Sequence, residues 1–114
     1  MIKVISGPRG SGKTHKMLEY VRQNLKRGDT IVMVSSAPEI VNWIAKQLVE
    51  DRINVRGCSH PTVEAMWKSN SFKEVTRYHE LTVIDGPDVS DEDLDKLIKY
   101  FESIGKDAVI TQLT

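Results

Sequence analysis

Residues 7–14 read Gly7-Pro8-Arg9-Gly10-Ser11-Gly12-Lys13-Thr14, which matches the pattern G-x-x-x-x-G-K-[ST] of a phosphate-binding loop. Glycines let a backbone curl so that successive N–H groups point at one phosphate. A helix that begins near Gly12 adds its positive end to the same anion site. Residues 7–14 are therefore candidates for holding phosphate groups, and a chance glycine-rich turn is the competing interpretation.

The residues on both sides of this loop fit the surroundings that the pattern requires. Residues 1–6 predict a short β-strand, and apolar residues between positions 17 and 25 recur at helical spacing. In a strand–loop–helix unit of this kind, the ammonium of Lys13 reaches the β- and γ-phosphates of a nucleotide, and the hydroxyl of Thr14 binds Mg²⁺.

The composition is that of one globular domain spanning residues 1–114. Apolar residues make up 39% of the chain and charged residues 28%, which is ordinary for a soluble protein. The sequence shows no apolar stretch of membrane-spanning length and no signal peptide. Because Cys58 is the one cysteine, no internal disulfide forms, and we expect a cytoplasmic protein.

The charge is zero overall but unevenly distributed. Residues 1–57 carry a net charge of +5 and residues 58–114 a net charge of −5. A basic half that contains a phosphate loop is consistent with an anionic ligand. A nucleic-acid partner stays open without direct support, because the sequence has no dense basic run.

Hydrophobic periodicity predicts alternating strands and helices after the first helix, which is expected to end at Gly28-Asp29. Residues 30–34 are nearly all apolar, as in a strand covered on both faces. The following helix is expected to pack an apolar face that includes Val49. Residues 53–56 form a weaker strand that Gly57 closes. Further helical segments are predicted at 62–68 and around Phe72, and the last helix and strand at 90–105 and 108–111.

A second informative stretch is residues 81–85, an apolar strand that ends in Asp85. In nucleoside triphosphatases with a phosphate loop, such a strand places its aspartate beside the Mg²⁺ site. The competing interpretation is an aspartate that belongs to the turn Asp85-Gly86-Pro87-Asp88. Residues 58–79 are expected to form a solvated face over a small apolar cluster, with a region that contacts a substrate or partner as the alternative.

The alternation of strands and helices predicts an α/β fold, in which helices cover both faces of a five-stranded parallel sheet to give three layers. Ligands of such sheets bind at the carboxyl ends of the strands. The loop at 7–14, Asp85 and Gln112 are therefore expected to lie along one edge.

At this point the sequence resembles the P-loop NTPases, in particular the RecA-like ATPases and the ATP-binding core of thymidine kinases. The resemblance rests on residues 7–14, on the strand that ends in Asp85, and on residues 105–112, and of these only the loop is a specific motif. It implies the strand order 3-2-4-5-1 and Mg-ATP as ligand, with Thr14 and Asp85 holding Mg²⁺. It also implies that Gln112 senses the γ-phosphate, although a capping role for Gln112 is an equal alternative.

The chain also departs from this family. Where the family commonly has a glutamate after the strand-end aspartate, this chain has Gly86, which has no acid–base group. Glu39 is the first candidate for the catalytic base in its place, but Ser36 and Glu39 also have the spacing of a capping box. Asp88 is a further candidate. The zinc-binding part and substrate-covering loop of thymidine kinases have no counterpart in these 114 residues.

Three functions follow as hypotheses. The first is a weak ATPase, in which Lys13 and Arg9 neutralise phosphate and Glu39 or Asp88 orients water. The second is a nucleotide-binding module without turnover, and the third is a kinase that acts on a nucleoside-type acceptor. The absence of an N-K-x-D motif favours ATP over GTP. If the resemblance holds, the first strand has an open edge, which predicts self-association or a protein partner.

Overall fold

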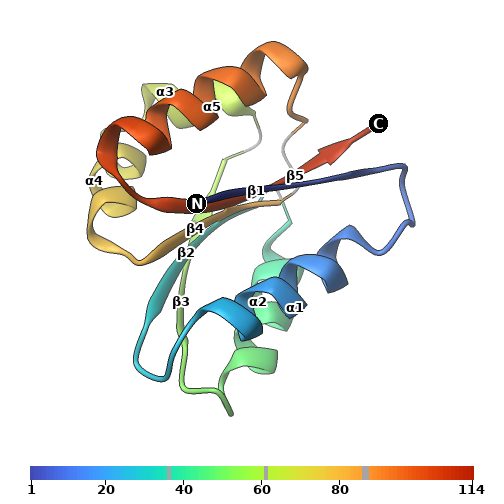
Figure 1. The fold of residues 1–114 in the computed structure, drawn as a ribbon, viewed down its shortest axis with the longest axis vertical. Helices are drawn as coiled ribbons and strands as arrows, with labels where there is room; N and C mark the ends of the chain where they lie inside the picture. Colours follow the sequence, from blue (N-terminus) through green and yellow to red (C-terminus); the bar gives the residue numbers. More distant parts are fainter. Residues whose placement is uncertain (36, 61, 86–87) are drawn as a thin grey trace.

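The computed structural model describes residues 1–35, 37–60, 62–85 and 88–114. Its elements follow one another as strands separated by helices (Figure 1). In chain order they are β1 Ile2–Gly7, α1 Lys13–Asn24, β2 Thr30–Ser35, α2 Pro38–Leu48, β3 Asn54–Ser59, α3 Val63–Lys68, α4 Asn70–Tyr78, β4 Leu81–Ile84, α5 Asp91–Ile104 and β5 Asp107–Leu113.

The strands form one parallel sheet in the order β1-β5-β4-β2-β3. This is the predicted order 3-2-4-5-1 counted from the other edge, so the expected α/β topology is confirmed. The last strand, β5, lies between β1 and β4, with Ile2 opposite Ala108 and Gly7 opposite Leu113 at the two ends of the β1–β5 ladder. All five strands point the same way, so their carboxyl ends share one edge of the sheet.

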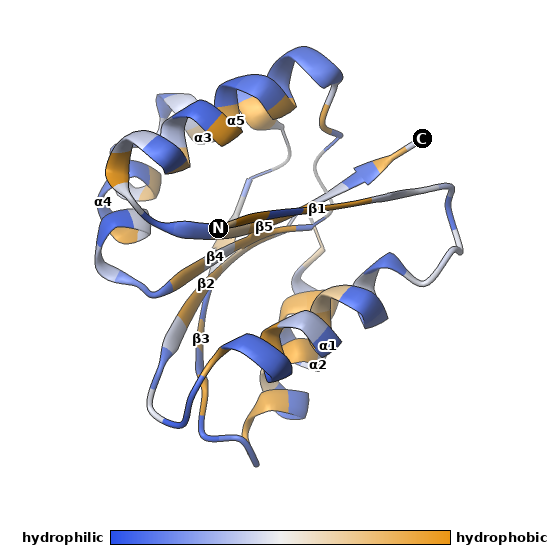
Figure 2. Ribbon diagram, in the orientation of Figure 1, coloured by the Kyte–Doolittle hydropathy of each residue, from blue (hydrophilic) through white to orange (hydrophobic). Residues whose placement is uncertain are grey.

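The predicted three layers are a sheet with helices on both faces, and one apolar core lies on each face of the sheet. Figure 1 shows α1 and α2 on one face and α3, α4 and α5 on the other. In Figure 2, apolar residues of the helices face the sheet and hydrophilic residues face outward. Met17, Val21, Ile44 and Leu48 fill the first core. The second core contains Met66, Phe72, Leu97, Phe101 and Ile110. Within the described part of the chain, no helix is long and apolar enough to cross a membrane.

Several predicted boundaries are wrong by a few residues. Helix α1 ends at Asn24, earlier than the predicted end at Gly28-Asp29. Val49 follows the end of α2 and is exposed, so it does not belong to the apolar face. The capping-box expectation involves Ser36, and the turn after Asp85 involves Gly86 and Pro87. These three residues lie outside the described residues. At α5 the Ser90 hydroxyl accepts a hydrogen bond from the N–H of Asp93 at 3.1 Å, which confirms the predicted cap.

The third strand is longer than expected because Gly57 continues it. Gly57 lies opposite Met33 inside the β2–β3 ladder, and β3 runs on to Ser59. A Cβ atom added at Gly57 would lie 2.9 Å from Cγ1 of Val41 on α2. The glycine is therefore needed because α2 packs closely against the strand, and it does not break the strand.

We expect Gly57→Ala to lower the free energy of unfolding by about 1–3 kcal/mol, because Val41 is β-branched and has little rotamer freedom with which to yield. Thermal unfolding measures this loss. The double variant Gly57→Ala, Val41→Ala is expected to lose less free energy of unfolding than the two single variants lose together, since the smaller side chain at position 41 relieves the contact. Additive effects would contradict this account.

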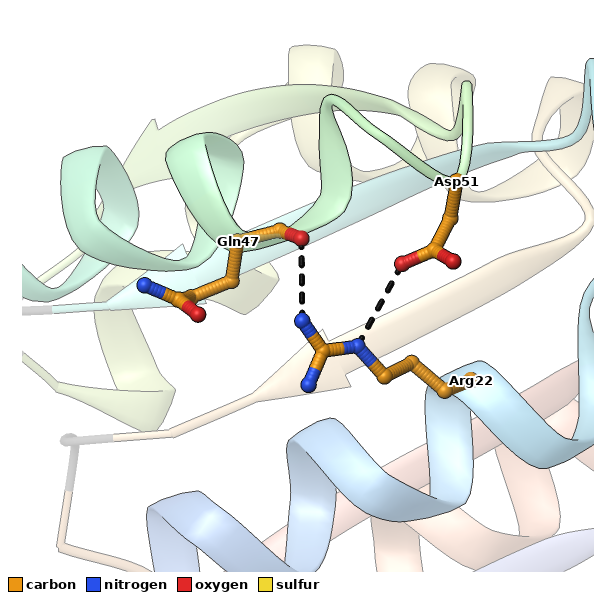
Figure 3. A network of polar contacts seen from close by, with 3 residues as sticks. All are labelled: Arg22, Gln47 and Asp51. Carbon is orange, nitrogen blue, oxygen red and sulfur yellow. Dashed lines mark hydrogen bonds and ion pairs between the residues drawn. The ribbon is translucent and has the colours of Figure 1, made fainter.

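Polar contacts at the surface join the two helices of the first core. The guanidinium of Arg22, in the last turn of α1, donates through Nε to Asp51 at 3.3 Å and through Nη2 to the Gln47 carbonyl at 3.0 Å (Figure 3). Both side chains of the ion pair are almost half exposed, so the pair fixes the mutual position of the helix ends more than it adds stability.

The carboxylate of Glu80 is hydrogen-bonded to the first residue of β2. Glu80, just before β4, accepts hydrogen bonds from the hydroxyl of Thr30 at 2.7 Å and from its N–H at 2.8 Å. These bonds hold the pKa of the Glu80 carboxyl below its ordinary value of 4.5, and the bond from the Thr30 hydroxyl has the larger effect.

Because the folded-state pKa of Glu80 is lowered, its stabilising effect is present above pH 4.5 and is lost as the pH falls through the folded-state value. Glu80 is exposed, so we expect Glu80→Gln to cost only a few tenths of a kcal/mol at pH 7. The melting temperatures of wild type and variant are then expected to converge in acid. A difference that grows as the pH falls would contradict the assignment.

Candidate functional site

The loop between β1 and α1 has the backbone that the glycine pattern predicts. Gly10 and Gly12 adopt φ angles of +81° and +80°, in the left-handed region that favours glycine. The N–H of Ser11 donates to the Pro8 carbonyl at 3.2 Å, which tightens the loop. Gly12 immediately precedes α1, so the first N–H groups of the helix have no carbonyl partner within the helix and open toward the loop.

Close packing inside the loop explains the glycine at its start. A Cβ atom at Gly7 would lie 2.5 Å from Oγ of Ser11, so a larger residue would force the Ser11 side chain to move. The Ser11 hydroxyl is buried and has no hydrogen-bond partner within the described residues.

The side chain of Lys13 folds back over this loop. Its ammonium donates to the Gly7 carbonyl at 3.0 Å and to the Pro8 carbonyl at 2.8 Å. An ammonium has three hydrogens, so one remains for a further acceptor. The positive charge of Lys13 is therefore held at the loop before any ligand binds, and among the described residues it forms no ion pair with a carboxylate.

A chain of side-chain hydrogen bonds connects the beginning of α1 to the ends of β4 and β5. The Thr14 hydroxyl donates to Oδ2 of Asp85 at 3.0 Å, and the Thr111 hydroxyl donates to Oδ1 at 2.7 Å. The N–H of Asp85 donates to the Val34 carbonyl at 2.9 Å, which fixes its backbone to β2. Asp85 is 6% exposed. The loop threonine and the strand-end aspartate thus meet across 71 residues of sequence.

A small open cavity of about 180 Å³ lies beside Asp85 at the carboxyl edge of the sheet, and it is lined by Arg9, Gly10, Lys13, Asp85, Asp88, Thr111 and Leu113. Cations come from the loop, and carboxylates come from the residues after β4. Its size suits a few phosphate groups, since whole small-molecule pockets are typically about 300–1,000 Å³.

Two larger hollows, of about 510 and 390 Å³, lie elsewhere, along β1. Size alone does not identify a site, and the glycine backbone, the held ammonium and the buried aspartate converge at the smaller cavity.

The donor set at this cavity suits a hard cation. Hydroxyl and carboxylate oxygens are the ligands that Mg²⁺ takes, usually one or two from the protein, completed by water and substrate phosphates. Thr14 donates its hydrogen to Asp85, which leaves the lone pairs of its oxygen free. The described residues contain no group of three or more His, Cys, Asp or Glu side chains fit to hold a metal. A cation here would therefore depend on phosphate oxygens from a ligand.

The structure brings together part of the predicted site. Arg9, Lys13, Asp85 and Asp88 line one cavity. Glu39 lies in the first turn of α2 and is exposed, and it does not line the cavity.

Gln112, which was expected at a γ-phosphate, is almost fully buried and bonded to protein groups. Its Nε2 donates to the Val89 carbonyl at 3.1 Å and to Oδ1 of Asp91 at 2.9 Å, and its Oε1 accepts from the Ser6 hydroxyl at 3.3 Å. Contact of this amide with a phosphate would require that these bonds break.

Sequence reasoning missed Thr111, which holds one oxygen of the Asp85 carboxylate. A threonine in a buried strand is ordinary, because β-branched residues favour strands. The available signal was its place directly before Gln112 at the carboxyl end of the last strand, where two polar residues in succession replace an apolar run.

Comparison with known proteins adds no assignment: no protein-family model matches the chain, and no curated protein matches it significantly.

Proposed function

We propose that this protein binds Mg-ATP at the cavity between residues 7–14 and Asp85 and hydrolyses it slowly, as a P-loop ATPase of the RecA-like type. The observation that carries the proposal is the hydrogen bond of 3.0 Å between the Thr14 hydroxyl and the Asp85 carboxylate. It sets the two residues that hold Mg²⁺ in this class side by side, next to the ammonium of Lys13.

In this proposal each group has a separate task. The N–H groups of the loop and of the first turn of α1 bind the β- and γ-phosphates, and the third hydrogen of the Lys13 ammonium, or the whole group after it leaves the carbonyls, neutralises their charge. Arg9, exposed at the mouth of the cavity, adds a second positive charge. Thr14 and Asp85 would hold Mg²⁺, which would supply positive charge against the developing negative charge of the phosphates.

The residue that orients water is the open part of the mechanism. Asp88 lines the cavity and Glu39 does not, so we place Asp88 first. Asp88→Asn is then expected to reduce phosphate release with little change in nucleotide affinity, whereas Glu39→Gln leaves both unchanged. The opposite ranking would transfer the role to Glu39.

The exposed position of Glu39 also supports a second candidate, a module that binds ATP without appreciable turnover. Asp88 is exposed as well, so neither carboxylate is enclosed by protein in the way that a positioned catalytic base usually is. In this alternative the nucleotide acts as a structural or regulatory ligand.

A melting-temperature series with ATP, ADP and GTP, each with Mg²⁺ and with EDTA, tests the binding proposal. A ligand at 100 times its dissociation constant adds about 2.7 kcal/mol to the native state, so Mg-ATP is expected to raise the midpoint by several degrees. An unchanged midpoint with every nucleotide would end the proposal. Phosphate release by wild type, measured against Lys13→Ala, then separates the ATPase from the module without turnover.

A further inference from the structure

The outer edge of β1 is an open strand edge between two hollows. Within the described residues, β1 pairs with β5 alone and stands at the end of the sheet. One hollow, of about 510 Å³, lies beside Ile2 and Ile98 of α5. The other, of about 390 Å³, lies beside Val4 and the α1 residues Lys16, Glu19 and Tyr20. Both faces of the sheet thus have space next to this strand.

The hydrogen bonds to β5 determine which backbone groups of β1 face outward. The N–H of Ala108 donates to the Met1 carbonyl, and the N–H of Thr114 donates to the Gly7 carbonyl. Since backbone groups alternate along a strand, Lys3 and Ile5 also point at β5. The N–H and C=O groups of Ile2, Val4 and Ser6 therefore point away from the sheet.

This outward set is symmetric about Val4. In an antiparallel pair, residues directly opposite each other exchange both N–H···O bonds at every second position. If a second β1 runs antiparallel with Val4 opposite Val4, then Ile2 lies opposite Ser6 of the other copy, and Ser6 opposite its Ile2. Every outward N–H and C=O then has a partner, and none is left over on either strand.

We infer that the β1 edge pairs with β1 of a second copy of this chain, antiparallel and centred on Val4, to form one continuous sheet across a twofold axis. Such an interface is isologous, since the same surface is used by both copies. Oligomers of this kind remove an edge that would otherwise invite indiscriminate pairing.

The helices beside β1 fit this arrangement. Helix α1 packs over both β1 and β5, and strands are spaced about 4.8 Å apart. The two copies of α1 would then run antiparallel about 10 Å apart, which is the interaxial distance of packed helices. The α1 residues that line the hollow include Lys16 and Glu19, so each copy offers both signs of charge to the other.

Amide hydrogen exchange of the pure protein, measured by NMR at micromolar and millimolar concentration, tests the pairing without a variant. The amides of Ile2, Val4 and Ser6 are expected to exchange at least about tenfold more slowly at the higher concentration. The amides of Lys3 and Ile5, bonded to β5, are expected to stay protected at both. Fast exchange of the outward amides at every concentration would overturn the inference.

Sedimentation equilibrium of two matched variants provides a second test. Val4→Pro removes only an outward N–H, a change that edge strands tolerate, and is expected to give a folded monomer with an unchanged response to nucleotide. Val4→Thr keeps the N–H and the branched Cβ and is expected to remain a dimer. A Val4→Pro protein that dimerises like wild type would also overturn the inference. Because the nucleotide response is recorded separately, failure of the dimer and failure of ATP binding are distinguishable.

Discussion

Lys13→Ala is expected to weaken Mg-ATP binding by about 10- to 100-fold, the range that corresponds to the 1.5–3 kcal/mol of a hydrogen bond to a charged group. The ammonium now donates to the carbonyls of Gly7 and Pro8, so it is held where the phosphates would lie and little side-chain ordering remains on binding. Calorimetric titration of wild type and variant with Mg-ATP measures the loss.

The control for this variant is Lys16→Ala. Lys16 lies one turn further along α1, is exposed, and does not line the cavity. The substitution removes the same charge from the same helix, so a general electrostatic effect would weaken binding equally in both variants. We expect Lys16→Ala to bind within about twofold of wild type, because Lys16 is exposed and outside the cavity, so its charge acts on the nucleotide only through water of high dielectric constant. Equal losses in the two variants would contradict a specific role for Lys13.

Asp85→Asn is expected to abolish the dependence of nucleotide binding on Mg²⁺. Wild type should bind Mg-ATP at least about tenfold more tightly than ATP with EDTA, while the variant should bind both alike. The reason is that asparagine keeps the shape of Asp85 but loses the charge that favours a hard cation. The same loss of charge also reduces repulsion of metal-free triphosphate.

Folding stability provides an independent readout for Asp85→Asn. The carboxylate accepts hydroxyl hydrogens from both Thr14 and Thr111, and an amide has one acceptor oxygen and a donor nitrogen. One hydroxyl therefore faces a donor and must turn away, so we expect a loss of about 1 kcal/mol. Asp88→Asn, in the same cavity, is the control and should keep both the Mg²⁺ dependence and the stability. Loss of Mg²⁺ dependence in Asp88→Asn alone would reassign the metal ligand.

The sheet could be predicted from the sequence because its signals are local or regular. The apolar runs that became β2 and β4 and the strand–loop–helix unit at 7–14 each specify their own structure. The strand order came from resemblance, since no local signal says that β5 inserts between β1 and β4. Gly57 was misjudged for a related reason. Its role depends on Val41 of α2, and a close approach between elements leaves no mark on the strand sequence itself.

The part of the site that a single motif carries could be read from the sequence, and the part that depends on contacts could not. Residues 7–14 and Asp85 follow from pattern and lie together in the structure. For Gln112 the sequence left two roles open, a phosphate contact and a cap, and in the structure its amide is hydrogen-bonded to Val89, Asp91 and Ser6. A polar residue at a strand end has several acceptors within reach, and only the packing of the loop before α5 selects among them. Thr111 was missed because its hydroxyl acts through a neighbour.

The position of β5 in the sheet also bears on the order of events in folding. The loop at residues 7–14 follows β1, yet β1 joins the sheet only through β5, which comes after the other four strands in chain order. The ladder between β1 and β5 closes over more than a hundred residues, a contact whose loop entropy makes it slow to form. The hydrogen bond between Thr111 and Asp85 also requires β5 to be in place. The candidate site is therefore completed late in folding, in one step with the sheet itself.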